Sequence, residues 1–258
     1  MSALRYVYGI ARATDAARVA AAGLIGIDER PVGSVTQGAL LAAVSDVDES
    51  EYSEAPLNEH VRDLDWLSAR AAQHQAVNGR LLELLGTVLP LSFGAIYRDD
   101  ERVRQMLSEN ARDRSEQLAS LAGHAEWVVT VSRDADAPAD DADVRALDAQ
   151  IAASPPGRAF LLERQRGTTL SRSLERRDSD AASTALSVLE GVAIRTYQEP
   201  VVAGGTDAVA LRASILVARD REPALAKAVG DLESRLAERG YRVRASGPWP
   251  AYRFGAMS

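Results

Sequence analysis

The sequence predicts an α+β protein with two domains. Its 258 residues are more than most single domains hold, since domains usually contain about 100 to 200 residues. Segments that alternate apolar and polar residues, as strands do, lie between segments whose apolar residues recur every three or four positions, as in amphipathic helices. We expect a boundary near Gly123, with an N-terminal α+β domain at residues 1–123 and a second domain at 124–258.

The N-terminal domain is predicted to open with a strand at residues 4–10, which are rich in aromatic and β-branched side chains. Two further strands are expected within residues 31–46, around a turn at Gln37 and Gly38, followed by an acidic loop at residues 45–54. An apolar stripe then predicts one amphipathic helix over residues 57–85.

A short buried strand or turn is expected at residues 88–93, where Pro90 favours extended backbone. Asp99 and Asp100 can cap a next helix, whose apolar face runs from Val103 to Leu121. Gly123 sits where this helix would end.

The second domain is predicted to begin with a strand at residues 125–132. The acidic run at residues 134–143 is interpreted as a solvated loop or helix approach, because a calcium site of the EF-hand type would need a glycine and a spacing that are missing. Residues 156–191 have the apolar spacing of a helix, but Gly167 and Ala181 on its apolar face are small and bury little surface. We therefore expect a partner helix, or a break near Gly167 or Ser179.

Strands are predicted at residues 194–202 and 208–217, joined by a glycine-containing turn at residues 203–207. A helix from Pro223 to Gly240 and a last strand from Tyr241 complete the domain. From residue 125 the order is strand, helix, strand, strand, helix, strand, which predicts a modified ferredoxin-like βαββαβ sandwich with a long helical region.

Composition excludes several classes of function. The chain has no cysteine, so it has no disulfide, thiolate nucleophile or cysteine-ligated metal. Its net charge of −7 repels a phosphate backbone, so we expect no nucleic-acid partner. Glu163 and Glu175 are interspersed among the arginines of residues 158–177, which are therefore interpreted as a solvated face. No segment is typical of a signal peptide or a membrane-spanning helix, so we expect a cytoplasmic protein.

Motifs for catalysis or cofactor binding are absent. The sequence holds no phosphate-binding glycine loop, no nucleophile elbow and no zinc-binding H-E-x-x-H pattern. His60 and His74 lie about 21 Å apart on one straight helix, too far to share a metal ion, so each is interpreted as a structural histidine. We expect neither a cofactor nor a metal.

Two aromatic, proline-containing motifs stand out. In LPLSFGAIYRDDERV, Phe93 and Tyr97 are candidate partner-binding residues. In GPWPAYRF, two prolines restrict the backbone around Trp249, Tyr252 and Phe254, which is how a rigid aromatic anchor for a partner protein is built. The same segment could instead fill a groove between the chain's own two domains.

These two motifs, together with RYVYGI, WLSARAAQHQAV and GRAFLLERQR, resemble the gas vesicle protein F/L family over essentially the whole chain. Ser92 stands where the family often has arginine, Ala251 where it often has proline, and Arg253 where it has a small polar residue. The resemblance implies a non-enzymatic accessory or minor structural protein, required for gas vesicle assembly and associated with gas vesicles. It also implies binding to the hydrophobic major shell protein and to other accessory proteins.

A rival hypothesis is a small-molecule-binding or enzymatic module on the ferredoxin-like half. It would require a pocket with convergent polar groups, which we would look for around His60 or His74. The sequence leaves the surface that contacts the shell protein, and the oligomeric state, open.

Overall fold

A computed structural model describes residues 3–134, 141–201 and 208–255. The predicted turn at residues 203–207 and most of the acidic run at 134–143 therefore lie outside the described residues. Contacts within the chain divide it into two units, Met1–Glu126 with Pro248–Ser258 (unit 1) and Trp127–Gly247 (unit 2). The domains expected at 1–123 and 124–258 stay a prediction.

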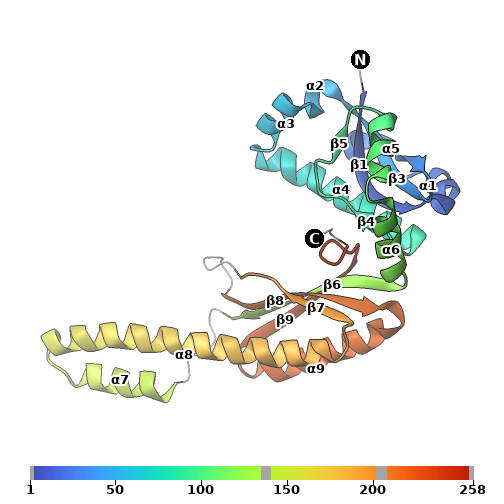
Figure 1. Cartoon of the computed structure of the whole chain (residues 1–258). Coiled ribbons are helices and arrows are strands. Elements are labelled where there is room, and N and C mark those ends of the chain that lie inside the picture. Colours follow the sequence, from blue (N-terminus) through green and yellow to red (C-terminus); the bar gives the residue numbers. More distant parts are fainter. Residues whose placement is uncertain (1–2, 135–140, 202–207, 256–258) are drawn as a thin grey trace. The chain divides into compact units, whose positions relative to one another are not determined.

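Unit 1 consists of one β-sheet and the helices that pack against it (Figure 1). Its sheet has the order β2-β3-β1-β4, and β5 also pairs with β1. The strands are β1 (Ala3–Arg12), β2 (Gly33–Gln37), β3 (Leu40–Asp48), β4 (Leu89–Pro90) and β5 (Ile96–Tyr97). The helices are α1 (Ala16–Ala21), α2 (Glu49–Tyr52), α3 (Glu54–His60), α4 (Leu64–Leu85), α5 (Asp100–Ser108) and α6 (Ala111–Ser120).

Helices cover both faces of this sheet. Six consecutive residues of β3, from Leu40 to Ser45, are buried, and neighbouring residues of a strand point to opposite faces. On one face Tyr6, Leu41 and Leu81 belong to a core cluster that β1, β3 and α4 share. Helix α5 contacts β2 and β3, and α6 contacts β1 and β4. The sheet therefore lies between two helical layers.

Unit 2 contains one sheet with the order β7-β8-β6-β9. Along the chain its elements are β6 (His124–Arg133), α7 (Ala142–Ala152), α8 (Pro156–Glu190), β7 (Arg195–Gln198), β8 (Ala208–Ala218), α9 (Glu222–Ala237) and β9 (Tyr241–Trp249). The first three residues of β6 and the last two of β9 are assigned to unit 1. Alternate residues of β8, such as Leu211 and Ile215, pack with Leu189 of α8 and Leu232 of α9 in one core cluster. One face of the sheet is thus covered by α8 and α9.

Several predicted elements agree with the structure. The hairpin around Gln37 and Gly38 forms between β2 and β3, and the helix that starts at Glu222 runs to Ala237 as α9. The long helical region is a single helix, α8, and α7 is the partner that packs against it. The expected break near Gly167 or Ser179 does not occur.

Three predicted elements were wrong in detail. The helix expected at residues 57–85 is divided into α3 and α4, because the Asp63 carboxylate accepts hydrogen bonds from the amides of Asp65 and Trp66 and so starts a new helix. The next helix is divided into α5 and α6 at Asn110, whose φ is 57°. The acidic loop expected at 45–54 is the end of β3 followed by α2, which buries Tyr52.

No helix within the described residues is both long enough and apolar enough to cross a membrane.

Candidate interaction site

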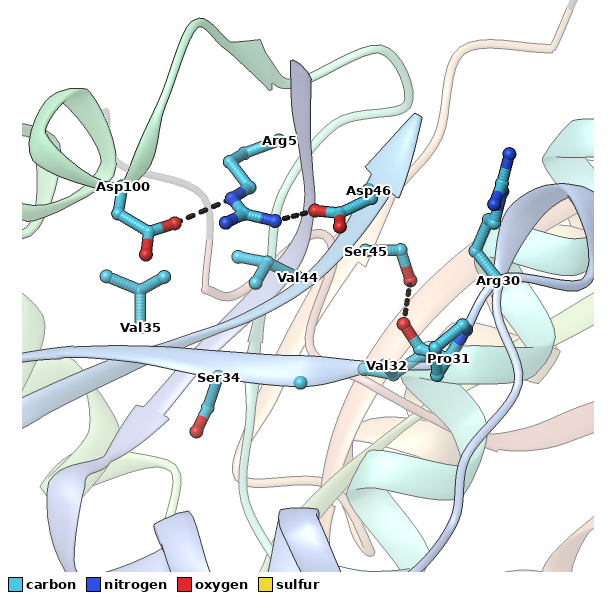
Figure 2. A pocket seen from close by; sticks show the side chains of 11 residues that line it. Arg5, Arg30, Pro31, Val32, Ser34, Val35, Val44, Ser45, Asp46 and Asp100 are labelled. Carbon is cyan, nitrogen blue, oxygen red and sulfur yellow. Dashed lines mark hydrogen bonds and ion pairs between the residues drawn. The ribbon is translucent and has the colours of Figure 1, made fainter. Parts of the chain in front are cut away.

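An open groove runs beside the edge strand β2 in unit 1 (Figure 2). Its volume is about 440 Å³, and its lining comes from β1, β2, β3, the segment before β2 and the start of α5. The Arg5 guanidinium lies between two carboxylates: its Nε is 2.6 Å from Oδ1 of Asp100, and it also forms an ion pair with Asp46. Since all three side chains are partly exposed, we expect these ion pairs to add less than about 1 kcal/mol each to stability.

Buried hydrogen bonds fix the segment before β2 against the sheet. Ser45 donates to the carbonyl oxygen of Pro31 over 3.0 Å, as Figure 2 shows. The hydroxyl of Tyr8 donates to Ser45 Oγ over 3.1 Å and accepts the backbone N–H of Ile27 over 2.8 Å. An alanine Cβ at Gly26 would lie 2.1 Å from this hydroxyl, so only glycine fits there.

The two predicted histidines have different surroundings. His74 is buried, and both of its ring nitrogens have partners: Nδ1 lies 2.9 Å from the hydroxyl of Tyr6, and Nε2 lies 3.1 Å from the carbonyl oxygen of Leu91. The carbonyl oxygen of Leu91 can only accept, so Nε2–H donates to it, and Nδ1 of the neutral ring accepts the hydroxyl of Tyr6. This hydroxyl in turn accepts the amide of Gly94.

Burial lowers the pKa of His74 and keeps the ring neutral, which suits this structural role. His60 is partly exposed; its ring stacks on Trp66 at 4.9 Å, and its Nδ1 lies 3.6 Å from a carboxylate oxygen of Glu51. Within the described ranges, no group of three or more His, Asp or Glu side chains is placed to hold a metal ion.

The C-terminal motif is anchored inside unit 1 by a buried carboxylate. Glu126 accepts the backbone N–H of Arg253 over 2.8 Å and that of Phe254 over 3.4 Å. The Phe254 side chain is buried, and Gly255 lies so close to the Ala251 carbonyl that a Cβ there would be 2.6 Å from its oxygen. Glu126 was not among the predicted site residues. The only feature of the sequence that points to Glu126 is a carboxylate at an otherwise apolar position of the predicted strand.

A second cavity brings together the two motifs that stood out in the sequence. It has a volume of about 300 Å³ and an apolar part formed by Ile10, Leu89, Pro90 and Leu91. Ser92, Arg114, Gln117, Tyr252 and Gly255 complete the lining. Residues of LPLSFG and of PAYRFG, which are far apart in the sequence, therefore border the same space.

Two buried polar atoms belong to side chains that line this cavity. The hydroxyl of Tyr252 and Oε1 of Gln117 are buried and make no hydrogen bond of normal geometry within the described residues. Burial raises the pKa of Tyr252 to about 12, and the neighbouring Asn78 side chain offsets part of this rise. The phenol is therefore neutral at physiological pH, and its hydroxyl interacts with the Asn78 side chain.

The structure distributes the predicted partner-binding residues over several places in unit 1. Tyr252 lines the cavity described above, whereas Tyr97 lines a separate hollow of about 420 Å³ between β5 and α5. Phe93 packs edge-on against Tyr6 and His74 at ring distances of 6.1 and 6.0 Å. Phe254 is buried and Trp249 is half-buried at the end of β9. A role of these residues in partner binding stays a prediction.

Comparison with known proteins gives consistent matches over the whole chain. A sequence model of the family described as "Gas vesicle synthesis protein GvpL/GvpF" matches residues 4–256. Gas vesicle protein L of Streptomyces sp. (strain CB03234) is 31% identical over 99% of this chain and 94% of its own length. Gas vesicle protein L2 of Halobacterium salinarum is 27% identical over 97% of this chain and 90% of its own length.

Solved structures show the same fold. The crystal structure of GvpF from Anabaena sp. PCC7120 matches with a TM-score of 0.76 at 19% identity, and that from Microcystis aeruginosa with 0.70 at 20%. Each comparison covers 100% of both chains. The mixed α/β arrangement with two antiparallel sheets is therefore that of GvpF. Since the family model spans residues 4–256, this chain belongs to the GvpL/GvpF family of gas vesicle synthesis proteins.

Proposed function

We propose that this chain is a non-enzymatic accessory or minor structural protein that binds the hydrophobic major shell protein and other accessory proteins during gas vesicle assembly. Membership of the GvpL/GvpF family implies a role in gas vesicle assembly and association with gas vesicles. We further propose that the chain has two domains and that the second is a modified ferredoxin-like sandwich. The element order of unit 2 supports this proposal.

The observation that carries the proposed binding role is the cavity of about 300 Å³ bordered by both sequence motifs. Its apolar part can take a hydrophobic side chain of a shell subunit, which would otherwise be exposed to water before the shell grows. Ser92, an exposed polar residue of the cavity lining, can hydrogen-bond the backbone next to that side chain. An apolar pocket with a few convergent polar groups is the usual form of a specific binding site.

The rival hypothesis of an enzyme or small-molecule-binding module gains no specific support around the two histidines. His74 uses both ring nitrogens within unit 1, and the His60 ring is stacked on Trp66. Neither side chain lines one of the three hollows described above. We therefore favour protein binding over catalysis.

Blocking the cavity tests this proposal. The Ser92 side chain is exposed at its edge, so Ser92→Trp can fill the space without disturbing the core. The matched control is Ser34→Trp, which fills the groove beside β2 instead. We expect Ser92→Trp to weaken binding of purified major shell protein at least about tenfold, and Ser34→Trp to leave it unchanged. Unchanged binding by a folded Ser92→Trp protein would remove the cavity from the contact surface.

A further inference from the structure

The first part of α8 carries an exposed apolar pair with arginines on both sides, and Glu163 is the one acidic residue between positions 158 and 172. The Phe160 and Leu161 side chains are 67% and 66% exposed, which is unusual for large apolar residues. Arg158 and Arg164 lie three residues before and after Leu161, and Arg172 lies three turns further along the same helix face. We call these three arginines and the two apolar residues the basic tip.

The arginines of the basic tip are available to a partner. Within the described part of the chain, none of Arg158, Arg164 and Arg172 forms an ion pair. The neighbouring Arg166 and Arg176, by contrast, pair with Asp148 and Asp141 and so hold α7 against α8. The positive end of the dipole of α8 lies at Pro156, which adds to the attraction for carboxylates.

Packing holds this part of α8 in place although it lies outside the main core of unit 2. The core cluster of unit 2 includes α8 residues only from Ala181 onward. Before that, α8 is packed against α7, which lies along it (Figure 1) and buries Val144 and Leu147. Ser173 adds a hydrogen bond to Asp141. The basic tip is therefore presented on a two-helix support.

A surface of opposite charge lies in unit 1, where α3 ends and α4 begins. Val61 is 38% exposed and Leu64 is 74% exposed. The acidic side chains around them are Glu54, Glu59, Asp63 and Asp65, all exposed and none in an ion pair within the described residues. We call these six residues the acidic corner. Arg62 is the one arginine or lysine between positions 54 and 65, a range that also holds His60.

We propose that the basic tip of one copy of this chain binds the acidic corner of a second copy. Each surface has two exposed apolar side chains at its centre and charged side chains around them, which is the usual anatomy of a protein–protein interface. The charges at the two rims are opposite, so encounter of the correct surfaces is accelerated and like surfaces repel. Both halves of the contact are present in every molecule, which makes a second copy the occupant.

The contact is heterologous, because the two surfaces that meet are different. Each molecule therefore keeps one free basic tip or acidic corner after binding, and addition continues until a ring closes or a linear chain forms. A small apolar centre on each side gives a weak contact, so assembly depends on protein concentration.

A charge-swap experiment on the full-length purified chain tests this proposal. Variant X carries Arg158→Glu and Arg164→Glu, which makes the tip acidic. Variant Y carries Glu54→Arg, Glu59→Arg and Asp65→Arg, which makes the corner basic and leaves Asp63, the cap of α4, in place. The control carries Arg80→Glu and Arg112→Glu, which change net charge as X does at two exposed positions of α4 and α6. Sedimentation velocity over a range of concentrations measures the average mass.

We expect the wild type and the control to gain mass with concentration, and the gain to shrink in high salt. X and Y alone should each need at least about tenfold more protein for the same mass, because like charges then face each other. A mixture of X and Y should recover assembly, since the acidic tip of X fits the basic corner of Y and the other two surfaces are unchanged.

Two results would overturn the proposal. The first is a wild-type chain that stays monomeric at every concentration. The second is a mixture of X and Y that associates no better than either variant alone. Circular dichroism of both variants confirms folding, and no shell protein is present, so either outcome is independent of the proposed shell binding.

Discussion

Replacing Gly26 by alanine should destabilise unit 1 through one steric conflict. The added Cβ would lie 2.1 Å from the hydroxyl oxygen of Tyr8 and 2.8 Å from Ser45 Oγ, both shorter than any normal contact. The φ of Gly26 is −109°, which any residue adopts, so backbone strain adds nothing. Tyr8 is completely buried and its ring cannot move into solvent.

The size of the effect follows from the hydrogen bonds that Tyr8 would lose. Moving its hydroxyl breaks the bond to Ser45 Oγ and leaves the amide of Ile27 without its acceptor. Each buried polar group without a partner costs about 1–3 kcal/mol, and forcing extra volume into a packed core costs about 1–3 kcal/mol. Allowing for partial relaxation, we expect the free energy of unfolding to fall by about 3–5 kcal/mol.

Urea unfolding followed by circular dichroism measures this loss, and hydrogen exchange at the Ile27 amide reports the broken bond directly. Gly33→Ala is the matched control, because a Cβ there meets nothing within 4 Å and its φ is not positive. We expect this control to change the free energy of unfolding by less than about 1 kcal/mol. A Gly26→Ala protein as stable as the control, with its Ile27 amide still protected, would refute the reasoning.

Two further predictions concern the interior of unit 1. Because burial lowers the pKa of His74 below its unfolded value of about 6.5, its contribution to stability is present above pH 6.5 and is lost as the pH falls. His74→Gln should remove this component of the pH dependence. If the free energy of unfolding changed identically from pH 7 to 5 in the wild type and in His74→Gln, the role given to His74 would be contradicted. Phe254 is buried, so Phe254→Ala should lower the free energy of unfolding by about 3–5 kcal/mol, as measured by urea titration. The control Arg244→Ala changes an exposed side chain and should lower it by less than about 0.5 kcal/mol.

Local patterns were sufficient for elements whose ends are encoded in neighbouring residues. The hairpin of β2 and β3 follows from alternation around a glycine turn, and α9 follows from a proline at its start and a glycine after its end. The small residues on the apolar face of α8 correctly indicated a partner helix. The division into α3 and α4 was missed because a single side chain, Asp63, begins a new helix inside a continuous apolar stripe.

Only part of the candidate cavity could be predicted from the sequence. Both motifs that border it were recognised as unusual, but nothing local indicated that Leu91 and Tyr252 line the same space. Gln117, which lines the cavity, lies on an ordinary helix and carried no signal. Glu126 was also missed, since a lone acidic residue in a strand gives no hint that it holds the backbone of the C-terminal motif.

The sequence by itself determined the class of fold, the positions of most strands and helices, and the family, because these depend on periodicity and on motifs that can be found one segment at a time. The tertiary structure alone decided which of these segments meet. It placed Phe254 in the interior, joined the two motifs around one cavity, and left Phe160 and Leu64 exposed. The physical reason is that burial and contact between distant residues depend on how whole layers pack, and local propensity does not encode that packing.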